Sequence, residues 1–450
     1  MCRTDMTKSE IESILAYMNA NPTEWDSLLE ASVIHKCGEV GRLISVDHRN
    51  GKPYLHFRFR NGPFSSPEPC FLPESFGNGT LRFASLPNKF IYGFRRSANR
   101  AQDDEAAQRA KERLSTILSP KCVPFSLPRR LQDFISREVG WNYSPKRDDY
   151  GLTDNVPIAD YMGTYFPRSF VEAYFFMSLL LQKAPIAESF LDRSEISIAD
   201  IGSGTGGNSL GVLWAIRDHC LLSDFEFPTV MATSIDKSED ALKTQTRMIR
   251  ALFPDRVNND LELLHYRSGA DFLKNVDRRM YSSGPFDMIM GWKSICEFYR
   301  SDADYLQNRG MYAEVLRLGD KHLENDGILA VCDVTNPPYP SHQRFLPCII
   351  NHEIQELLRK GETDLVPILP LSCAHWYGCC SGYFACFIQK SFKVSHNALP
   401  CGQVQDGQGV FLKVLAKRKF SVTVLQDETP AQEYFTGANA KGVTSQKVRV

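Results

Sequence analysis

The residues best suited to chemistry form one short glycine-rich segment after the apolar run 196–199. The segment reads Asp200-Ile-Gly202-Ser203-Gly204-Thr205-Gly206. Glycines at this spacing let the backbone turn sharply beneath a ligand, and the polar residues that follow can open a helix. Taken alone, the segment is compatible with a nucleotide site or with a purely structural turn, so the surrounding elements must decide between the two.

From about residue 150 onward, strand-like apolar runs alternate with helical stretches. Such alternation predicts an α/β fold, in which a parallel sheet carries helices on both faces. The predicted strands are 196–202, 229–236, 261–269, 286–292 and 327–334. The predicted helices lie around 207–219, 238–252, 270–278, 304–323 and 351–359.

The D-x-G-x-G-x-G form of residues 200–206 resembles motif I of the class I S-adenosylmethionine-dependent methyltransferases rather than the G-x-G-x-x-G of dinucleotide enzymes. Four further matches follow in the order that this family requires. They are 229–236, 269–271, 284–292 and 323–331. The resemblance implies an enzyme that has the Rossmann-like sheet of class I methyltransferases and uses S-adenosylmethionine as its cofactor.

The same resemblance implies roles within the site. The glycine loop presents backbone N–H groups to the carboxylate end of the cofactor, Asp236 accepts hydrogen bonds from the ribose, and Asp271 faces the adenine. Methyl transfer from a sulfonium is an in-line displacement, so placement of the acceptor can supply most of the catalysis. The candidate catalytic residue is Glu297, as a proton acceptor. The candidate cofactor-binding residues are Asp200, Gly202, Ser203, Gly204, Thr205, Gly206, Asp236, Asp271, Gly291 and Trp292.

The segments that flank these matches narrow the resemblance. Tyr161-Met-Gly-Thr-Tyr-Phe-Pro-Arg168 precedes motif I, Ser294-Ile-Cys-Glu297 follows the fourth strand, and Lys419-Phe420-Ser421 opens a last predicted strand. In kind and order, residues 160–426 are similar to the methyltransferase-like family that attends the small ribosomal subunit of bacteria and mitochondria. This resemblance implies that the chain acts on RNA or assembles with the small ribosomal subunit. A small-molecule or protein acceptor and a non-catalytic, cofactor-binding assembly factor are the alternatives.

Five of the 13 cysteines lie between residues 373 and 401. Three or four thiolates in one loop suit an iron–sulfur cluster or structural zinc. Cys373, Cys379 and Cys386 match the cluster-binding positions of the family, and Cys401 is a candidate fourth ligand. Because the second gap is one residue shorter than in the family and no cysteine follows the last predicted strand, the alternative is that these are small packing residues.

A proline-rich segment, Asn336-Pro-Pro-Tyr339, matches the motif with which amino-methyltransferases hold a flipped base. In that family the motif follows strand four, whereas here it follows strand five. We therefore interpret it as a loop that leaves a strand.

Length and composition favour a globular chain of two or three parts, since 450 residues with 43% hydrophobic content can fill two cores. The 52 Lys and Arg residues nearly balance the 53 Asp and Glu residues, which excludes a globally polybasic protein. The longest apolar stretch, 170–181, is too short to span a membrane. The N-terminus carries acids early and has no apolar run, so we predict a cytoplasmic protein, with a mitochondrial location implied by the family resemblance.

The predicted organisation has three parts. Residues 1–130 form an N-terminal α+β extension, in which Asn50-Gly51 marks a hairpin and 82–130 carries eleven basic against four acidic residues with aromatic residues interleaved. Basic and aromatic residues together suit single-stranded nucleic acid, but we favour the simpler interpretation, a solvated helix face together with aromatic residues of the core. Residues 119–128 are predicted to be a linker. Residues 150–426 form the methyltransferase domain, including the cysteine-rich loop 373–401, and 427–450 form a tail.

Overall fold

The computed structural model describes most of the chain beyond residue 99 and parts of the first 99 residues. The described residues are 14–16, 18, 25, 28, 31–35, 40–49, 52–59, 70–77, 81–85, 100–119, 122–144, 156–223, 225–254, 256–264, 269–297, 310–335, 337, 345–376, 386–388, 392–406, 410–426, 435–438 and 444–447. The chain divides into two compact units. The first holds residues 1–108 with 191–194 and 220–227, and the second holds the remainder.

The first unit contains an antiparallel sheet of five strands in the order β4-β3-β2-β1-β5. Its elements are β1 (Ser32–His35), β2 (Val40–Arg49), β3 (Lys52–Phe59), β4 (Cys70–Phe71), the short helix α2 (Glu74–Gly77) and β5 (Leu81–Ser85). The hairpin predicted at Asn50-Gly51 is confirmed, because β2 and β3 pair on either side of it. Alternate residues Leu43, Leu55 and Phe57 are buried and pack with Trp25 in the core of this unit.

The second unit is built on a large mixed sheet. Its strands are β7 (Glu195–Ile201), β8 (Thr229–Asp236), β9 (Val257–Leu263), β10 (Phe286–Trp292), β11 (Leu323–Val334), β12 (Leu365–Leu369), β13 (Cys386–Ile388), β16 (Val410–Lys417), β17 (Phe435–Ala438) and β18 (Thr444–Lys447). Strands β9-β8-β7-β10-β11 are parallel, and β16 runs antiparallel between β11 and β12. The chain order reverses between β7 and β10, which makes the carboxyl ends of these two strands the point where α/β folds bind ligands.

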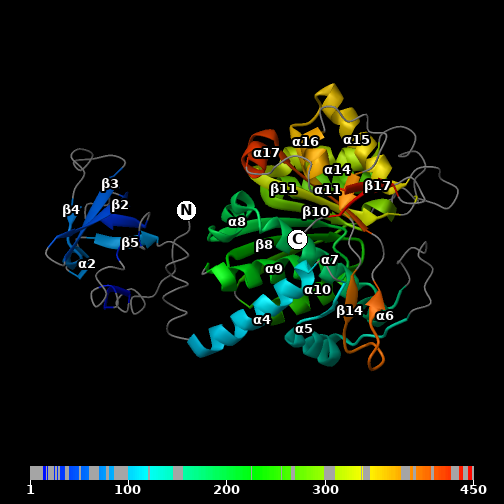
Figure 1. The fold of residues 1–450 in the computed structure, drawn as a ribbon, viewed down its shortest axis with the longest axis horizontal. Helices are drawn as coiled ribbons and strands as arrows, with labels where there is room; N and C mark the ends of the chain where they lie inside the picture. Colours follow the sequence, from blue (N-terminus) through cyan, green and yellow to red (C-terminus); the bar gives the residue numbers. More distant parts are fainter. Residues whose placement is uncertain are drawn as a thin grey trace. The chain divides into compact units, whose positions relative to one another are not determined.

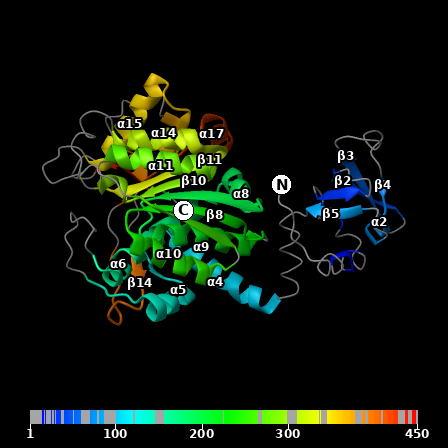
Figure 2. The ribbon, with the colours of Figure 1, turned by 180° about the vertical axis from the view of Figure 1, so that it is seen from behind.

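Helices cover both faces of this sheet. The helices that follow β7 in the chain are α9 (Gly207–Ser223), α10 (Glu239–Leu252), α11 (Gly269–Ser283), α14 (Met311–His322), α15 (Leu346–Lys360), α16 (Leu371–Trp376) and α17 (Arg418–Leu425). Figure 1 shows α9 and α10 on one face and α11, α14 and α15 on the other, and Figure 2 shows the same layers from behind. The predicted α/β, Rossmann-like class of this unit is therefore confirmed.

Helices and short strands that precede β7 complete the second unit. They are α4 (Arg100–Leu118, of which 109–118 belongs to this unit), β6 (Pro124–Ser126), α5 (Arg129–Phe134), the π-helical turn η2 (Ile135–Val139), α6 (Ile158–Thr164), α7 (Phe166–Leu180) and α8 (Ala184–Leu191). Strand β6 pairs with β14 (Lys393–Ser395), which pairs with β15 (Gln405–Asp406). The apolar stretch noted at 170–181 belongs to α7, which is buried almost throughout. No described helix is long and apolar enough to cross a membrane.

Three sequence predictions about elements are wrong in detail. Residues 418–425 form helix α17, although their β-branched residues favour a strand. The buried residues Ser421 and Val424 are three positions apart, as on one face of a helix, and Val422 between them is exposed. The predicted linker 119–128 contains β6, whose Phe125 is buried. The third strand occupies Val257–Leu263 rather than 261–269, and its polar first half hid it from a search for apolar runs.

The division of the chain also differs from the predicted boundary at residue 130. Residues 109–130 lie in the second unit, where Arg113 of α4 forms a bidentate pair with Asp218, donating from Nε at 2.7 Å and from Nη2 at 2.6 Å. Asp218 is fully buried and also accepts a hydrogen bond from the Tyr174 hydroxyl. Arg113 is thus a structural anchor and not part of a solvated basic surface.

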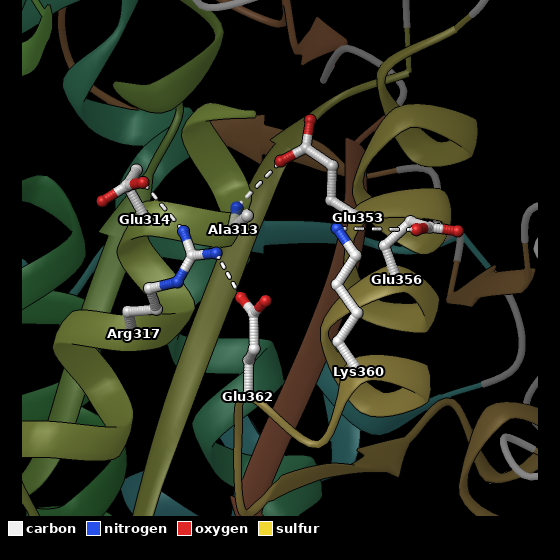
Figure 3. A network of polar contacts seen from close by, with 7 residues as sticks. All are labelled: Ala313, Glu314, Arg317, Glu353, Glu356, Lys360 and Glu362. Carbon is white, nitrogen blue, oxygen red and sulfur yellow. Dashed lines mark hydrogen bonds and ion pairs between the residues drawn. The ribbon is translucent and has the colours of Figure 1, made fainter. Parts of the chain in front are cut away.

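A polar network joins α14 and α15 on the outer layer (Figure 3). Glu353 of α15 accepts a hydrogen bond at 2.8 Å from the backbone N–H of Ala313 and so satisfies the N-terminal turn of α14. Arg317 bridges Glu314 and Glu362 at 2.8 and 2.7 Å. These contacts hold the helix that covers β11 in place.

Candidate cofactor site

The glycine loop between β7 and α9 has a left-handed backbone at each of its three glycines. The φ angles are 73° at Gly202, 55° at Gly204 and 81° at Gly206, which other residues rarely adopt. A Cβ at Gly202 would lie 2.3 Å from Cβ of Ser294, and one at Gly206 would lie 2.4 Å from Cγ of Gln245. Both the backbone angles and the close neighbours therefore require glycine here.

Asp200, near the end of β7, links the loop to helix α9 by hydrogen bonds. The carboxylate is buried and accepts hydrogen bonds from Nδ2 of Asn208, at 2.7 Å to each oxygen, and from the hydroxyl of Ser209 in the first turn of α9. Burial raises the pKa of Asp200 to about 7, the Ser209 hydrogen bond opposes this shift, and the charge of Asp236 adds to it. Its visible role is to fix the loop on the helix.

Asp236 ends β8 beside the loop. One carboxylate oxygen accepts a hydrogen bond from the backbone N–H of Gly204 and the other from that of Ser238, both at 2.8 Å. Burial raises the pKa of Asp236, and these backbone hydrogen bonds oppose the shift. Each oxygen keeps a lone pair, so the carboxylate can accept further hydrogen bonds from a ligand.

The backbone N–H groups of the loop are largely engaged within the protein. Those of Gly202 and Ser203 donate to the carbonyl of Ile235, that of Gly204 donates to Asp236, and that of Gly206 donates to the carbonyl of Ser203. The prediction that these N–H groups point at the carboxylate end of a cofactor is therefore not supported at these four positions. The first three tie the loop to the end of β8, and that of Gly206 closes a turn within the loop.

Two hydroxyl groups of the loop give the clearest indication of a ligand-binding site. Within the described part of the chain, Oγ of Ser203 and Oγ1 of Thr205 are buried and have no hydrogen-bond partner. A buried hydroxyl without a partner costs on the order of 1–3 kcal/mol. Two such groups flanking Gly204 fit a polar ligand that lies against the loop, as S-adenosylmethionine would.

Tyr161 of α6 lies across the loop. Its hydroxyl oxygen is 3.1 Å from the position that a Cβ of Gly204 would occupy. Burial raises the pKa of Tyr161, and the negative charges of Asp236 and Glu297 raise it further. The phenol therefore stays protonated beside both carboxylates and can donate a hydrogen bond.

The fourth parallel strand, β10, brings Gly291 and Trp292 to the same edge of the sheet. A Cβ at Gly291 would lie 2.9 Å from Cδ1 of Ile295, so the turn after β10 packs closely on the strand. Trp292 is buried against Phe176, and its Nε1 has no hydrogen-bond partner among the described residues. Gly291 pairs with Ile201 of β7, so this end of β10 lies at the switch point, and the role of both residues toward a cofactor stays a prediction.

The residue after Trp292 adds a feature that sequence reasoning missed. Lys293 has a φ of 55°, which is unusual for a residue with a side chain. Its Nζ lies 2.6 Å from Oε2 of Glu172, a fully buried carboxylate of α7. The two residues are 121 positions apart, so only the charged residue inside the apolar run of α7 could have hinted at a buried partner.

Ser294 and Glu297 connect β10 to the loop. The Ser294 hydroxyl donates to the carbonyl of Ile201 at 2.9 Å, and the backbone N–H of Glu297 donates to the carbonyl of Ser294. The Glu297 carboxylate is near enough to Tyr161 to raise its pKa. The structure thus brings Asp200, Asp236, Gly291 and Glu297 to one edge of the sheet.

The remaining predicted site residues are placed differently. Asp271 lies in the first turn of α11 and accepts a hydrogen bond from Asn275, so its role toward an adenine stays a prediction. The Asn336-Pro-Pro-Tyr339 motif lies almost wholly outside the described residues, which include only Pro337 of it.

The predicted metal ligands do not gather in the described part of the chain. Cys373 is buried in α16, where Nζ of the fully buried Lys413 lies 2.8 Å from its sulfur, and Cys401 is exposed. Cys379 and the side chain of Cys386 lie outside the described residues. Among the residues that are described, no group of three or more potential ligands could hold a metal ion, so an iron–sulfur cluster and zinc receive no support.

No family model matches the chain, and the search of curated proteins gives no significant match. Solved structures to which the chain is similar include a protein from Listeria monocytogenes described as a candidate class I S-adenosylmethionine-dependent methyltransferase. The identity is 13%, 57% of this chain and 62% of the other are covered, and the TM-score is 0.29. The chain thus spans less than two thirds of that protein.

Two others are an O-methyltransferase from Bacillus cereus in complex with SAH (13% identity, 55% and 80% covered, TM-score 0.29) and an rRNA methylase from Streptococcus thermophilus (14%, 53% and 96%, TM-score 0.24). At these scores the likeness is too loose to carry a function. The chain's own strand order and site geometry have to do so.

Proposed function

We propose that this protein is an S-adenosylmethionine-dependent methyltransferase. The observation that carries the proposal is the pair of buried, unpartnered hydroxyls of Ser203 and Thr205 in a glycine loop at the switch point of a doubly wound sheet. Asp236 stands beside them at the end of the second strand, where its free lone pairs can accept hydrogen bonds from a ribose. The resemblance of residues 200–206 to motif I supports the same cofactor.

The residues of the site then act by binding and positioning. The Ser203 and Thr205 hydroxyls and the Asp236 carboxylate hold the cofactor, while Tyr161 covers the loop. S-adenosylmethionine supplies a methyl group on a sulfonium, which needs an acceptor placed in line with the breaking bond. Glu297, on the same edge of the sheet, accepts the proton that the acceptor loses.

We propose RNA of the small ribosomal subunit as the acceptor class. The resemblance of residues 160–426 to the family that attends this subunit supports it. The basic segment 82–130 supports RNA binding less strongly than its sequence alone does. Arg113 is hydrogen-bonded to the buried Asp218, and Phe83 packs on the core of the first unit.

Calorimetry with S-adenosylmethionine tests cofactor binding. Replacing Ser203 by Ala or Thr205 by Val should weaken binding by about fivefold each, since one hydrogen bond contributes about 1 kcal/mol. Ser421→Ala is the matched control, because its hydroxyl is buried but already bonded to the carbonyl of Arg418 in α17. Failure of the intact protein to bind the cofactor would remove the proposal.

Transfer of a labelled methyl group tests the acceptor. The protein is incubated with purified small ribosomal subunits, and RNA, protein and small-molecule fractions are counted separately. Label in RNA that Glu297→Gln reduces supports the proposal, whereas label in another fraction shows a different acceptor class. Cofactor binding without any transfer indicates the non-catalytic factor.

A further inference from the structure

Arginines from three helices of the second unit gather at the C-terminal end of α10. Arg250 is exposed in the last turn of α10, and Arg130 of α5 donates from Nη2 to the carbonyl of Ala251 at 3.0 Å. The guanidinium of the half-buried Arg217 of α9 lies 5.6 Å from the centroid of the Trp214 ring. Helix α5 packs against α10, on the face of the sheet that α9 and α10 cover (Figure 2). We call Arg130, Arg217 and Arg250 the arginine cluster.

Packing between the helices brings the members of the cluster together. Trp214, which lies beneath Arg217, packs edge-on against Phe253 at the end of α10, with ring centroids 5.4 Å apart. The hydrogen bond from Arg130 ends at Ala251, two residues before Phe253. Burial lowers the pKa of Arg217, and the positive charge of Arg130 lowers it further. The guanidiniums of these two arginines are therefore close enough to repel each other.

Among the described residues, no carboxylate forms an ion pair with any guanidinium of the cluster. Asp218, which follows Arg217, is fully buried, and Arg113 occupies both of its oxygens. The Tyr174 hydroxyl donates to it as well. A half-buried cation without an acid loses hydration that no ion pair replaces, and the Trp214 ring compensates for only part of this loss. The cluster therefore costs stability unless an anion from outside meets it.

The acids of the neighbouring turns have cations of their own. Asp133 of α5 lies 3.8 Å from Nε of Arg129, and Glu138 of η2 lies 3.8 Å from Nη2 of Arg247. A guanidinium has five N–H donors, and the structure uses one of them at Arg130. The remaining donors suit phosphate, because two N–H groups of a guanidinium match two phosphate oxygens.

We propose that the arginine cluster binds phosphates of an RNA strand. Arg130 and Arg217 hold one phosphate between them, and the exposed Arg250 holds a neighbouring one. Arg130 also covers the carbonyl end of α10, which would otherwise repel an anion. Arg217 lies ten residues after Gly207, or about 15 Å along α9, so the cluster holds the strand away from the methylated nucleotide. The choice of RNA over another phosphate-bearing partner rests on the proposed function.

Fluorescence anisotropy of the full chain with a labelled single-stranded RNA of about twelve nucleotides, at several salt concentrations, tests the proposal. The variant R217M/R250Q should bind at least tenfold more weakly. Its slope of log affinity against log salt should fall by about 1.4, since each lost phosphate contact contributes about 0.7. Arg217→Lys, which keeps the charge, should retain the slope. Because a methionine still covers Trp214, the unfolding temperature of R217M/R250Q should not fall.

The matched control is K274Q/R278Q, which removes two exposed cations from α11 on the other face of the sheet. Like the cluster, these two side chains form no ion pair with a described carboxylate. The control should leave both the affinity and the salt slope unchanged. Equal losses in the two double variants, or an unchanged slope in R217M/R250Q, would overturn the proposal. Binding of anionic phospholipid vesicles but not of RNA, lost in R217M/R250Q, would also overturn it and assign the cluster to a membrane surface.

Cofactor calorimetry separates this proposal from the function of the second unit. R217M/R250Q should bind S-adenosylmethionine as the intact protein does, because Arg217 lies about three helical turns along α9 from the glycine loop. An intact protein that binds the cofactor but shows no RNA binding through the cluster would overturn the inference and leave the methyltransferase proposal standing. RNA binding through the cluster without cofactor binding would do the reverse.

Discussion

Gly204→Ala tests whether the glycine loop is the cofactor site. Gly204 has a φ of 55°, and the new methyl group would lie 3.1 Å from the hydroxyl oxygen of Tyr161. It would therefore occupy the space between the loop and Tyr161, next to Asp236. The chain offers a matched control in Gly361, which ends α15 with a φ of 66° and has nothing within 4 Å of the corresponding position.

The expected magnitudes separate backbone strain from loss of the site. An alanine in the left-handed conformation lowers the free energy of unfolding by about 1–2 kcal/mol. The alanine also reduces the conformational entropy of the unfolded chain, which offsets about 0.4–1 kcal/mol of this loss. Both variants should therefore unfold only a few degrees lower than the intact protein. Gly204→Ala should in addition weaken cofactor binding by at least tenfold, or about 1.4 kcal/mol, while Gly361→Ala leaves it unchanged.

Thermal unfolding and calorimetry with S-adenosylmethionine measure both effects in the same preparations. The combination of Gly204→Ala with Tyr161→Phe should restore part of the lost affinity if the hydroxyl is the obstacle, because removing it opens the space. Cofactor binding by Gly204→Ala as tight as that of the intact protein would refute the assignment of this loop. An equal loss in Gly361→Ala would show that strain alone explains the result.

Three further outcomes are expected. The pKa of Asp200 is raised in the folded state to about 7, so the folded state binds the extra proton and Asp200 should lower the free energy of unfolding by about 2–3 kcal/mol as the pH rises from 5 to 8. In urea unfolding, Asp200→Asn should show a fall that is smaller by about this amount, and an equal fall in both proteins would contradict the assignment. Lys293→Met leaves Glu172 buried without its cation and should lower the free energy of unfolding in urea by about 3–5 kcal/mol, most of which the double variant with Glu172→Gln should recover. A decrease below about 1 kcal/mol for the single variant would contradict the role of this pair. Cys373→Ser should lower the unfolding temperature without changing the metal content by elemental analysis, because the thiol contacts the Lys413 amine; loss of bound iron or zinc would show that a metal was held there after all.

Local patterns in the sequence predict much of the fold. The apolar runs at Thr229–Asp236 and Phe286–Trp292 form strands with the predicted bounds, because buried parallel strands need continuous apolar residues. The glycine loop could be located because its backbone angles admit almost no other residue. Helix α17 was mistaken for a strand because local propensity favoured a strand and tertiary packing overrode it.

Contacts between distant segments could not be predicted in the same way. Tyr161 reaches Gly204 from a helix that precedes the sheet, and Lys413 meets Cys373 from the other side of the cysteine-rich loop. Nothing in the spacing of these residues indicates that they meet. The engagement of the loop N–H groups by Ile235 also depends on how two strands end side by side.

The described hydrogen bonds indicate that the site is built before a ligand arrives. Ser209, which donates to Asp200, accepts a hydrogen bond at 3.1 Å from Gln245 of α10, and the same amide donates to Ser234 of β8 at 2.7 Å. Ser234 in turn donates to Asn259 of β9 at 2.8 Å. This chain fixes the loop to three strands and two helices, so a ligand would not have to order it, and the binding free energy of the Ser203 and Thr205 hydroxyls is not spent on folding the loop.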